Sequence, residues 1–286
     1  MIVVTGATGN IGRTLVPLLA DAGEDVVAVS RRERPADLPA GDLPAGVRHA
    51  RADVGSAASM RPVLDGADAL FLLLGGELNS HGEHPDALLD AAARAGVKRV
   101  VLVSSQLNST RPKAPSHARL RQFEAAVRGS GLGFTVLRPS GFASNAFAWA
   151  DAVRAERTVL APFGDVALPV VDPADIAGVA AAALLEDGHL GRTYELTGPQ
   201  AVSPRQQAAA IAEALGEEVA FVELTRAQAH AQLARFMPEE AIGGTLDVLG
   251  VPLPAEREVS GDVERVTGRP ARPFAAWAAR NLPAFR

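Results

Sequence analysis

A glycine-rich stretch close to the start of the chain restricts the possible folds more than any other feature. Residues 2–4 read Ile-Val-Val, residues 6–12 read Gly-Ala-Thr-Gly-Asn-Ile-Gly, and a Leu-rich amphipathic stretch follows at once. At this spacing the first glycine permits a tight turn, the second permits close approach to the backbone, and the third lets a helix pack closely on the preceding strand. The stretch therefore predicts a strand, a turn and a helix, as at the start of a βαβ unit.

The same alternation of strand and helix continues as far as residue 197. Several Val- and Leu-rich runs are continuously apolar, which is typical of parallel strands buried on both faces. We expect strands at 2–5, 25–30, 47–51, 69–74, 99–103, 133–137, 167–171 and 193–196, and helices at 11–22, 57–64, 84–95, 117–129, 143–155 and 173–185. The pattern predicts an α/β fold with a Rossmann-type, doubly wound parallel sheet.

The character of the sequence changes after residue 197. Helices are expected at 203–215 and 225–233, and prolines become frequent near the end of the chain. We therefore expect a Rossmann domain over 1–197, with part of a substrate cleft from 140–165, and a smaller, mostly helical C-terminal substrate lobe over 198–286. Ligands of open α/β sheets bind at the carboxyl ends of the strands, so the lobe is expected there.

The position of the glycine loop between a strand and a helix predicts a dinucleotide-binding site. The N–H groups at the start of the helix and the positive end of its dipole attract a pyrophosphate. An ordinary glycine-rich turn is the alternative, and the flanking strand and helix argue against it.

The end of the second expected strand favours NADP over NAD. NAD enzymes usually carry Asp or Glu there, about 20 residues past the loop, to bind the ribose hydroxyls. This sequence reads Val29-Ser30-Arg31-Arg32, with no acidic residue before Glu33. Arginine can bind the additional phosphate of NADP through two hydrogen bonds. We therefore expect NADPH as the cofactor, with solvated surface arginines as the alternative interpretation.

Characteristic segments are spread along nearly the whole chain, at residues 5–12, 53–54, 73–75, 103–105, 130–132, 135–142, 145 and 194–199. Their resemblance is to atypical short-chain dehydrogenases, in particular the NmrA-like group. Together with the two arginines, it implies that the cofactor contacts Gly6, Thr8, Gly9, Asn10, Ile11, Gly12, Arg31, Arg32, Asp53, Val54, Leu73, Leu74, Gly75, Ser104, Ser105, Pro139 and Ser140. The group includes quinone reductases, triphenylmethane-dye reductases and redox-sensing regulators that bind the dinucleotide without turnover.

The sequence lacks the Tyr-x-x-x-Lys pair with which standard short-chain dehydrogenases pass a proton to the substrate. Its only tyrosine is Tyr194, and its only lysines are Lys98 and Lys113. A quinone or another conjugated acceptor can take hydride directly, because the cofactor supplies the difficult chemistry. We therefore expect an NADPH-dependent oxidoreductase acting on a small conjugated or quinonoid acceptor. The alternative is a redox-sensing regulatory protein that binds NAD(P) without turnover.

Several side chains near the expected site are candidates for contact with the acceptor, and each has an ordinary structural alternative. His117 could donate a proton near neutral pH, or be an exposed residue at a helix start. Ser105 could hydrogen-bond a substrate oxygen, or satisfy local backbone groups. The candidates for substrate contact are Gln106, Phe142 and Asn145. Phe142 could form the wall of a site for a planar acceptor, together with Phe147 and Trp149, or these rings could belong to the core.

The composition argues against several other classes of function. The net charge is −5 and the Lys and Arg residues are scattered, so there is no electrostatic footprint for nucleic acid. The chain has no cysteine, and His81 and His84 lack a third ligand, so we expect no metal site. No apolar stretch is long enough to span a bilayer. We expect a cytoplasmic protein that acts on a small-molecule substrate as a monomer or a homodimer.

Overall fold

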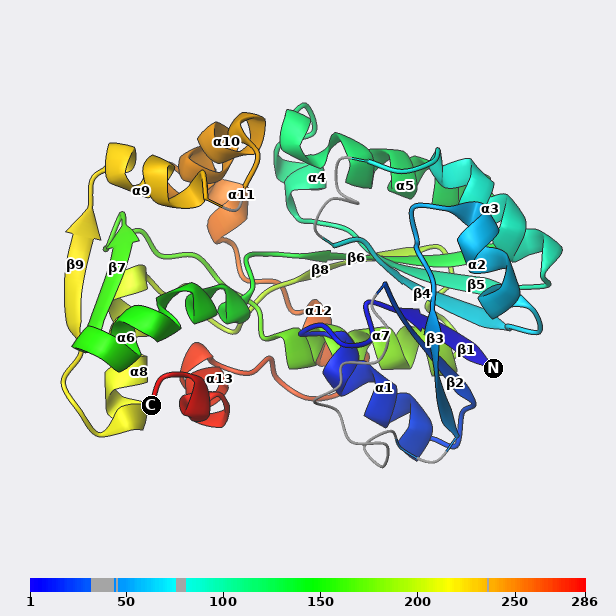
Figure 1. The fold of residues 1–286 in the computed structure, drawn as a ribbon, viewed down its shortest axis with the longest axis horizontal. Helices are drawn as coiled ribbons and strands as arrows, with labels where there is room; N and C mark the ends of the chain where they lie inside the picture. The colour runs from blue at the N-terminus through cyan, green and yellow to red at the C-terminus, as the bar shows by residue number, and fades with distance from the viewer. Residues whose placement is uncertain (32–43, 45, 76–80, 236) are drawn as a thin grey trace. The chain divides into compact units, whose positions relative to one another are not determined.

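The computed structural model describes residues 1–31, 44, 46–75, 81–235 and 237–286 (Figure 1). The chain forms two compact units. The first contains residues 1–108, 117–138 and 176–194, and the second contains residues 109–116, 139–175 and 195–286. This division differs from a single boundary after residue 197, because the second unit also takes in two segments from the middle of the chain.

A seven-stranded sheet forms the centre of the first unit, in the order β3-β2-β1-β4-β5-β6-β8. The strands are β1 Ile2–Thr5, β2 Val26–Ser30, β3 Val47–Arg51, β4 Ala69–Leu73, β5 Arg99–Val103, β6 Gly133–Pro139 and β8 Arg192–Leu196. β1 pairs in parallel with β2 on one side and with β4 on the other. The strand order therefore reverses between β1 and β4, the point where ligands bind in open α/β sheets. The expected α/β fold with a Rossmann-type parallel sheet is confirmed.

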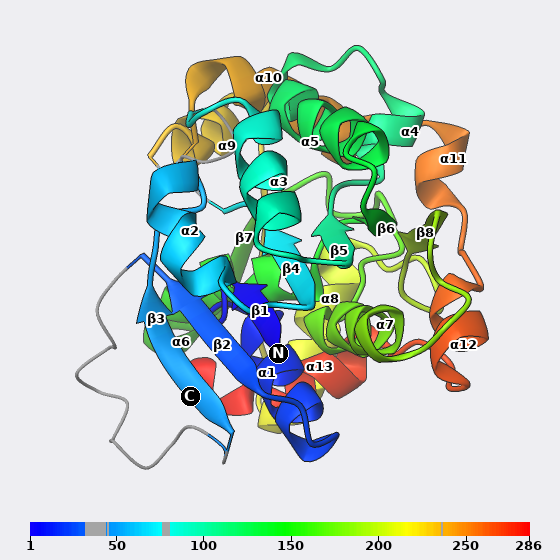
Figure 2. The same cartoon turned by 90° about the vertical axis from the view of Figure 1, so that its right-hand side faces the viewer.

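Helices cover both faces of this sheet (Figures 1 and 2). Helices α1 (Gly12–Asp21) and α7 (Pro173–Leu185) lie on one face. The opposite face carries α2 (Ala57–Leu64), α3 (Pro85–Arg94) and α5 (Ala118–Gly129). Because both faces are covered, the central strands are buried along their length, and this burial accounts for their continuous apolar sequence. The core on the second face includes Val3, Met60, Leu70, Leu102 and Phe123.

The second unit has a small parallel sheet of its own, which pairs β7 (Thr158–Pro162) with β9 (Ala220–Leu224). Its other elements are helical: η3 Ala143–Trp149, α6 Ala150–Glu156, α8 Pro204–Leu215, α9 Arg226–Leu233, α10 Glu239–Gly250, α11 Pro254–Arg257, α12 Asp262–Thr267, α13 Phe274–Arg280 and η4 Leu282–Ala284. Two short segments, α4 (Leu107–Thr110) and η2 (Pro115–His117), lie where the chain passes between the units. The helical character expected of the C-terminal region is therefore present.

An aromatic cluster closes the core of the second unit. The ring of Phe147 lies 5.0 Å from that of Trp277 and 6.2 Å from that of Phe285. This cluster places Phe147 in the core, which was one of its two interpretations.

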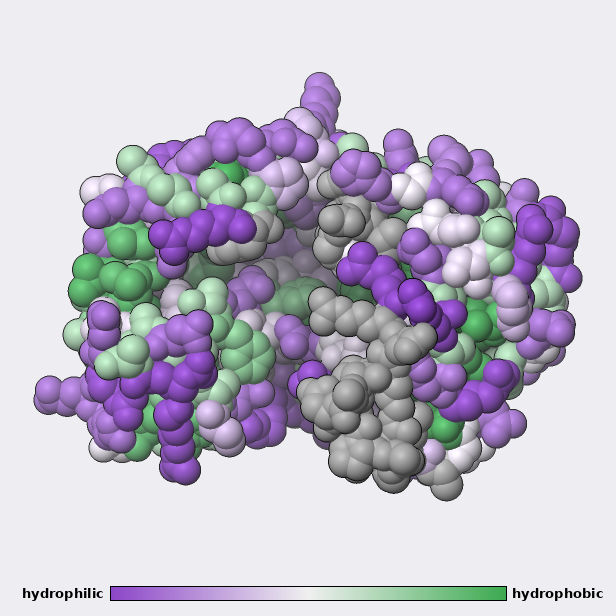
Figure 3. Space-filling view, viewed as in Figure 1, coloured by the Kyte–Doolittle hydropathy of each residue, from purple (hydrophilic) through white to green (hydrophobic). Residues whose placement is uncertain are grey.

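Figure 3 shows hydrophobic surface at its left edge, over β9, where Val222 is 45% exposed. Among the described helices, none is long and apolar enough to cross a membrane.

Two expected elements differ from the structure, and two strands in it were not expected. Residues 167–171 form no strand and make only isolated bridges, Leu168 with Val202 and Val171 with Phe142, because Pro169 cannot donate to a ladder. The helix expected over 143–155 is divided into a 3₁₀ segment and α6. Strands β7 and β9 were not expected, since each is only five residues long and partly exposed.

Candidate functional site

The glycine loop follows β1 and leads into α1, as the sequence predicts. Gly6 has a φ of +65°, a conformation that side chains with a Cβ disfavour. The Gly9 N–H donates to the Gly6 carbonyl oxygen at 2.9 Å. A Cβ on Gly12 would lie 2.4 Å from that same oxygen, so only glycine allows α1 to start this close to the turn.

The start of α1 is suited to an anion from outside the helix. Ile11 precedes the helix without a capping side chain, and the first turn contains no acidic residue. Since the first N–H groups of a helix have no acceptor within it, they and the dipole favour a bound negative charge. Gly9 and Asn10 are exposed beside this helix start, whereas Ile11 is buried. The residues present therefore fit a pyrophosphate held by main-chain amides.

A buried hydroxyl joins the loop to the neighbouring strand at the switch point. Thr5 is fully buried, its hydroxyl donates to the Phe71 carbonyl oxygen at 3.1 Å, and it accepts from the Leu73 N–H at 2.8 Å. The Leu73 side chain packs against Gly6. The structure thus brings Leu73 beside the glycine loop, and Leu74 and Gly75 follow Leu73 in the chain.

The end of β2 is basic, as expected, and the structure adds an arginine that the sequence analysis missed. Arg31 is exposed just after β2, while Arg32 lies outside the described residues. Arg51, the last residue of β3, pairs in register with Ser30 and donates from Nε to the Arg31 carbonyl oxygen at 3.2 Å. Arg13 donates from Nε to the Thr8 carbonyl oxygen at 2.9 Å. Only the strand register shows that Arg51 lies beside Arg31 at the end of β2.

Asp53 and Val54 follow β3 at the same edge of the sheet. The Asp53 carboxylate accepts from the Gly55 N–H at 2.9 Å, and the Asp53 N–H donates to the Ser59 hydroxyl at 2.9 Å. Asp53 is exposed and Val54 is buried. Asp53 thus orders the turn before α2 and still presents its side chain to solvent, where the resemblance expects the adenine.

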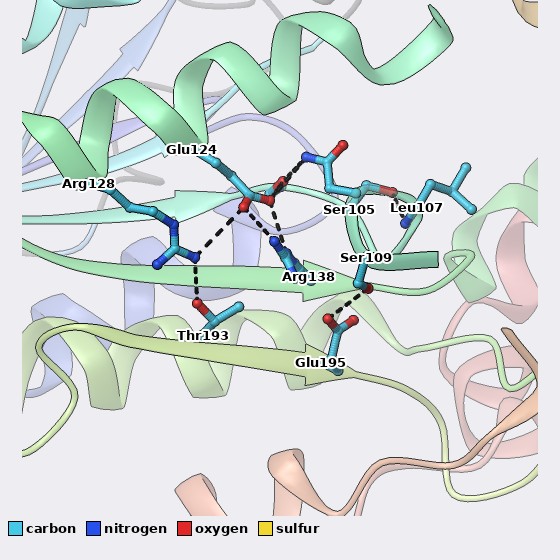
Figure 4. A network of polar contacts seen from close by, with 10 residues as sticks. Ser105, Leu107, Ser109, Glu124, Arg128, Arg138, Thr193 and Glu195 are labelled. Carbon is cyan, nitrogen blue, oxygen red and sulfur yellow. Dashed lines mark hydrogen bonds and ion pairs between the residues drawn. The ribbon is translucent and has the colours of Figure 1, made fainter. Parts of the chain in front are cut away.

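The residues after β5 belong to a buried polar network (Figure 4). The Ser104 hydroxyl donates to Oε1 of Glu124 at 2.5 Å, so Ser104 is engaged inside the protein. The Asn108 amide nitrogen donates to Oε1 of Glu124 at 3.0 Å and to the Ser104 hydroxyl at 2.8 Å. Ser105 accepts from the Leu107 N–H at 3.2 Å and is only half-buried. Between the two serines, Ser105 is therefore the one with a surface that an acceptor can reach.

Glu124 is the centre of this network and is an ionised carboxylate. Burial by itself would raise the pKa of Glu124, but hydrogen bonds from Arg138, Ser104 and Asn108 outweigh burial, and the pKa lies below its usual range. Arg138 contacts the carboxylate with Nε at 3.0 Å and Nη2 at 2.7 Å. Glu124 lies in the stretch where standard enzymes of this kind carry their Tyr-x-x-x-Lys pair, and no sequence signal marked it.

His117 immediately precedes α5 and is half-buried rather than exposed. Burial lowers the pKa of its imidazole, and the positive charge of Arg121 lowers it further. A lowered pKa reduces the protonated fraction at neutral pH, so His117 is a poorer proton donor than its residue type suggested.

Gln106 is buried in the first unit, and the other candidates belong to the second unit. Ser140 donates from its hydroxyl to the Pro169 carbonyl oxygen at 2.7 Å, and its N–H donates to the Leu196 carbonyl oxygen at 2.9 Å. Pro139 is buried, Phe142 is half-buried, and Asn145 is exposed. Asn145 and Phe142 thus retain accessible surface, whereas Ser140 is tied to backbone groups of its own unit.

His84, one of the two histidines weighed as metal ligands, has a local role. Its Nδ1 accepts from the Asp86 N–H at 3.4 Å, at the start of α3. Among the described residues, no group of three or more potential ligands gathers around a common point.

The fold and the loop geometry define a dinucleotide-binding protein of the short-chain dehydrogenase type. Residues 6–187 match the model of a family described as NAD(P)H-binding, and the chain belongs to this family, among its NmrA-like, atypical members. The expected resemblance is therefore confirmed, and NAD(P)H is the cofactor class.

Three relatives show which chemistry accompanies this fold. A (4-alkanoyl-5-oxo-2,5-dihydrofuran-3-yl)methyl phosphate reductase from Streptomyces griseus is 38% identical over 288 residues, which cover 100% of this chain and 99% of the relative. An NAD(P)H azoreductase from Xenophilus azovorans is 32% identical over 290 residues, with 100% and 99% coverage. The crystal structure of an NADPH-dependent quinone oxidoreductase from Escherichia coli, in complex with NADPH, superposes with a TM-score of 0.80 at 27% identity and covers 98% of this chain and 99% of its own. The chain is therefore grouped with NAD(P)H-dependent reductases, as expected.

Proposed function

We propose that this protein is an NADPH-dependent reductase that delivers hydride to a small conjugated or quinonoid acceptor without a tyrosine–lysine pair. The cofactor supplies the hydride, which carries two electrons and one hydrogen to the acceptor, and the second hydrogen arrives as a proton from solvent. The chain's own task is to hold the nicotinamide and the acceptor against each other in a site with little water.

The observation that carries this proposal is where the tyrosine and the lysines lie. Tyr194 is buried on β8, and its hydroxyl lies 2.8 Å from Nδ1 of His189. Lys98 pairs with Asp68 at 2.9 Å, at the amino end of β5 and away from the edge that carries the glycine loop. Lys113 is exposed in the second unit. A simple ketone needs a strong general acid when it accepts hydride, whereas a quinone or an enone spreads the charge over its conjugated system.

The relatives support the same class of acceptor. Their names specify an alkanoyl-oxo-dihydrofuran, azo compounds and quinones, each of which contains a conjugated electron-poor group. Hydride transfer to such a group requires orientation more than proton donation. We therefore propose Ser105, Gln106, Phe142 and Asn145 as residues that contact the acceptor.

NADPH, rather than NADH, is the cofactor that the basic end of β2 favours. Arg31 and Arg51 meet there through the backbone bond described above, and neither Ser30 nor Arg31 offers a carboxylate to the ribose hydroxyls. A guanidinium fits the additional phosphate of NADPH, and a carboxylate would repel it.

An assay of cofactor oxidation tests the proposal. Purified protein is mixed with NADPH and a panel of quinones, azo dyes, enones and simple ketones, and the same panel is run with NADH. We expect turnover with conjugated acceptors, little with simple ketones, and a preference for NADPH. Good reduction of simple ketones alone would contradict the acceptor class, and preference for NADH would contradict the role of the arginines. Binding of NADPH without oxidation by any acceptor would instead support the non-catalytic sensor.

A further inference from the structure

One arginine on α5 is enclosed by the protein without being neutralised by it. Arg121 is half-buried, its Nη1 atom is fully buried, and this atom has no hydrogen-bond partner in the part of the chain that the structure describes. Two other half-buried arginines of this unit are satisfied: Arg138 by Glu124, and Arg99 by backbone carbonyl oxygens, including that of Leu184 at 2.8 Å. Leaving a buried charged donor unpaired is costly, so Arg121 needs an explanation.

The position of Arg121 points to the ligand-binding edge of the sheet. Helix α5 connects parallel strands β5 and β6, so it begins at the carboxyl edge, where the glycine loop also lies. Helical periodicity places His117, Arg121 and Glu124 on one face of this segment. Since Glu124 contacts Ser104 and Asn108, Arg121 lies one turn closer to the open edge than the network in Figure 4.

A second unpaired polar atom belongs to the same region. Asn108 is 7% exposed, and its amide nitrogen is used by Glu124 and Ser104, but its Oδ1 is buried with no partner among the described residues. The unpaired donor of Arg121 calls for an acceptor on a ligand, and the unpaired acceptor of Asn108 calls for a donor, such as a hydroxyl, on the same ligand.

The electrostatics of the helix start select an anion for this position. The first turn of α5 has no acidic residue and no side-chain cap. Burial lowers the pKa of His117, and the positive charge of the neighbouring Arg121 lowers it further. The nearest carboxylate on this helix face, Glu124, is already neutralised by Arg138.

We propose that Arg121, with His117 beside it, binds a phosphate or carboxylate group carried by the acceptor, so that the preferred substrates are conjugated acceptors with such a substituent. The assignment of this group to the acceptor rests on the proposed reductase function. A guanidinium provides directed N–H donors for phosphate or carboxylate oxygens, and a partly desolvated site strengthens these bonds. Binding the substituent at α5 orients the conjugated group with respect to the cofactor edge.

Anion binding to the NADP⁺-saturated protein tests the site without turnover. NADP⁺ fills the glycine loop first, so that added anion cannot bind there. Inorganic phosphate and acetate are then titrated calorimetrically into the wild type, Arg121→Gln and the control Arg94→Gln, whose exposed arginine lies in the last turn of α3. We expect Arg121→Gln to weaken binding roughly 10-fold or more, and Arg94→Gln to leave it unchanged. The tighter of the two anions identifies the substituent.

Arg121→Lys serves if Arg121→Gln does not fold. Lysine retains the charge but loses the directed donors, so we expect binding to weaken by a few-fold. Absence of anion binding to the wild type, or equal binding by the wild type and the variants, would overturn the proposal.

A kinetic experiment then links the site to the acceptor. The ratio of KM for a neutral quinone to KM for its carboxylated or phosphorylated analogue is measured in each protein. We expect this ratio to fall roughly 10-fold in Arg121→Gln relative to Arg94→Gln. An unchanged ratio would contradict the assignment to the acceptor. A protein that binds phosphate through Arg121 but reduces nothing would contradict the reductase function and leave the anion site in place.

Discussion

Two helices begin at the same edge of the sheet, and they are built in opposite ways. At the start of α1 the contacts come from the backbone, because Gly6, Gly9 and Gly12 remove the side chains that would obstruct it. At the start of α5 the polar groups are side chains, His117 and Arg121 among them. The start of α1 can hold a pyrophosphate, a group that many enzymes bind. The side chains at the start of α5 can instead be exchanged one at a time.

This difference explains why the family model identifies the cofactor but leaves the acceptor open. Backbone recognition leaves a glycine pattern in the sequence, which any member of the family shares. Side-chain recognition leaves no pattern, because its residues are positioned by packing and can be exchanged without loss of the fold. Substitutions at each helix start can show whether the two act independently of each other.

Substitution of Gly12 by valine is expected to have the largest effect on cofactor binding. The added Cβ would meet the Gly6 carbonyl oxygen at 2.4 Å, so the loop and α1 cannot keep their present contact. We expect the dissociation constant for NADPH, measured by calorimetry, to rise more than roughly 100-fold. Gly243→Ala is the control, because Gly243 lies within α10 with open space around it. Wild-type affinity in Gly12→Val would refute the backbone-binding model.

Substitution of Glu124 by glutamine tests the side-chain-built start of α5. The change leaves Arg138 without its carboxylate and weakens the bonds to Ser104 and Asn108. Breaking a buried pair of this kind is expected to reduce the free energy of unfolding by about 3 kcal/mol, measured by urea denaturation. Glu217→Gln is the control, because its partner Arg157 is a surface residue and such pairs contribute little. Equal stabilities of the two variants would show that the network is not structural.

Substitution of Arg51 by glutamine is expected to have a smaller effect, confined to the choice of cofactor. Loss of one guanidinium near the end of β2 should weaken NADPH binding roughly 10-fold relative to NADH. Arg61→Gln removes the same charge from an exposed position on α2 and should leave the ratio of the two affinities unchanged. If Arg51→Gln also left that ratio unchanged, the end of β3 would have no part in recognition of the phosphate.

The smallest expected effect is a difference in acid sensitivity between the two helices. The folded-state pKa of Glu124 is lowered by its hydrogen bonds, so its contribution to stability is complete above the usual pKa of glutamate and is lost as the pH falls below that value and through the lowered one. Hydrogen exchange should therefore accelerate in α5 before α1 as the pH is lowered. In Glu124→Gln, which has no such titration, the two helices should respond alike. Parallel loss of protection in the wild type would contradict this assignment.

Much of the fold follows from local patterns in the sequence. The central strands of the parallel sheet were predicted closely because both of their faces are buried, which requires continuous apolar runs such as Ala69–Leu73. Strands β7 and β9 were missed because each is short and partly exposed, and their pairing joins residues about sixty positions apart in the chain. The aromatic residues after Ser140 were left open, and only packing against Trp277 assigns Phe147 to the core.

The candidate site likewise has one part that the sequence predicted and another that only the structure showed. By itself the sequence determined the glycine loop, the basic end of β2 and the absence of a Tyr-x-x-x-Lys pair, since each is a matter of residue type at a fixed local spacing. Only the tertiary structure placed Arg51 beside Arg31, buried Nη1 of Arg121 without a partner among the described residues, and engaged Ser104 with Glu124. Those relations depend on strand register and on which groups are removed from water together, and neither quantity is a property of residues that are neighbours in the chain.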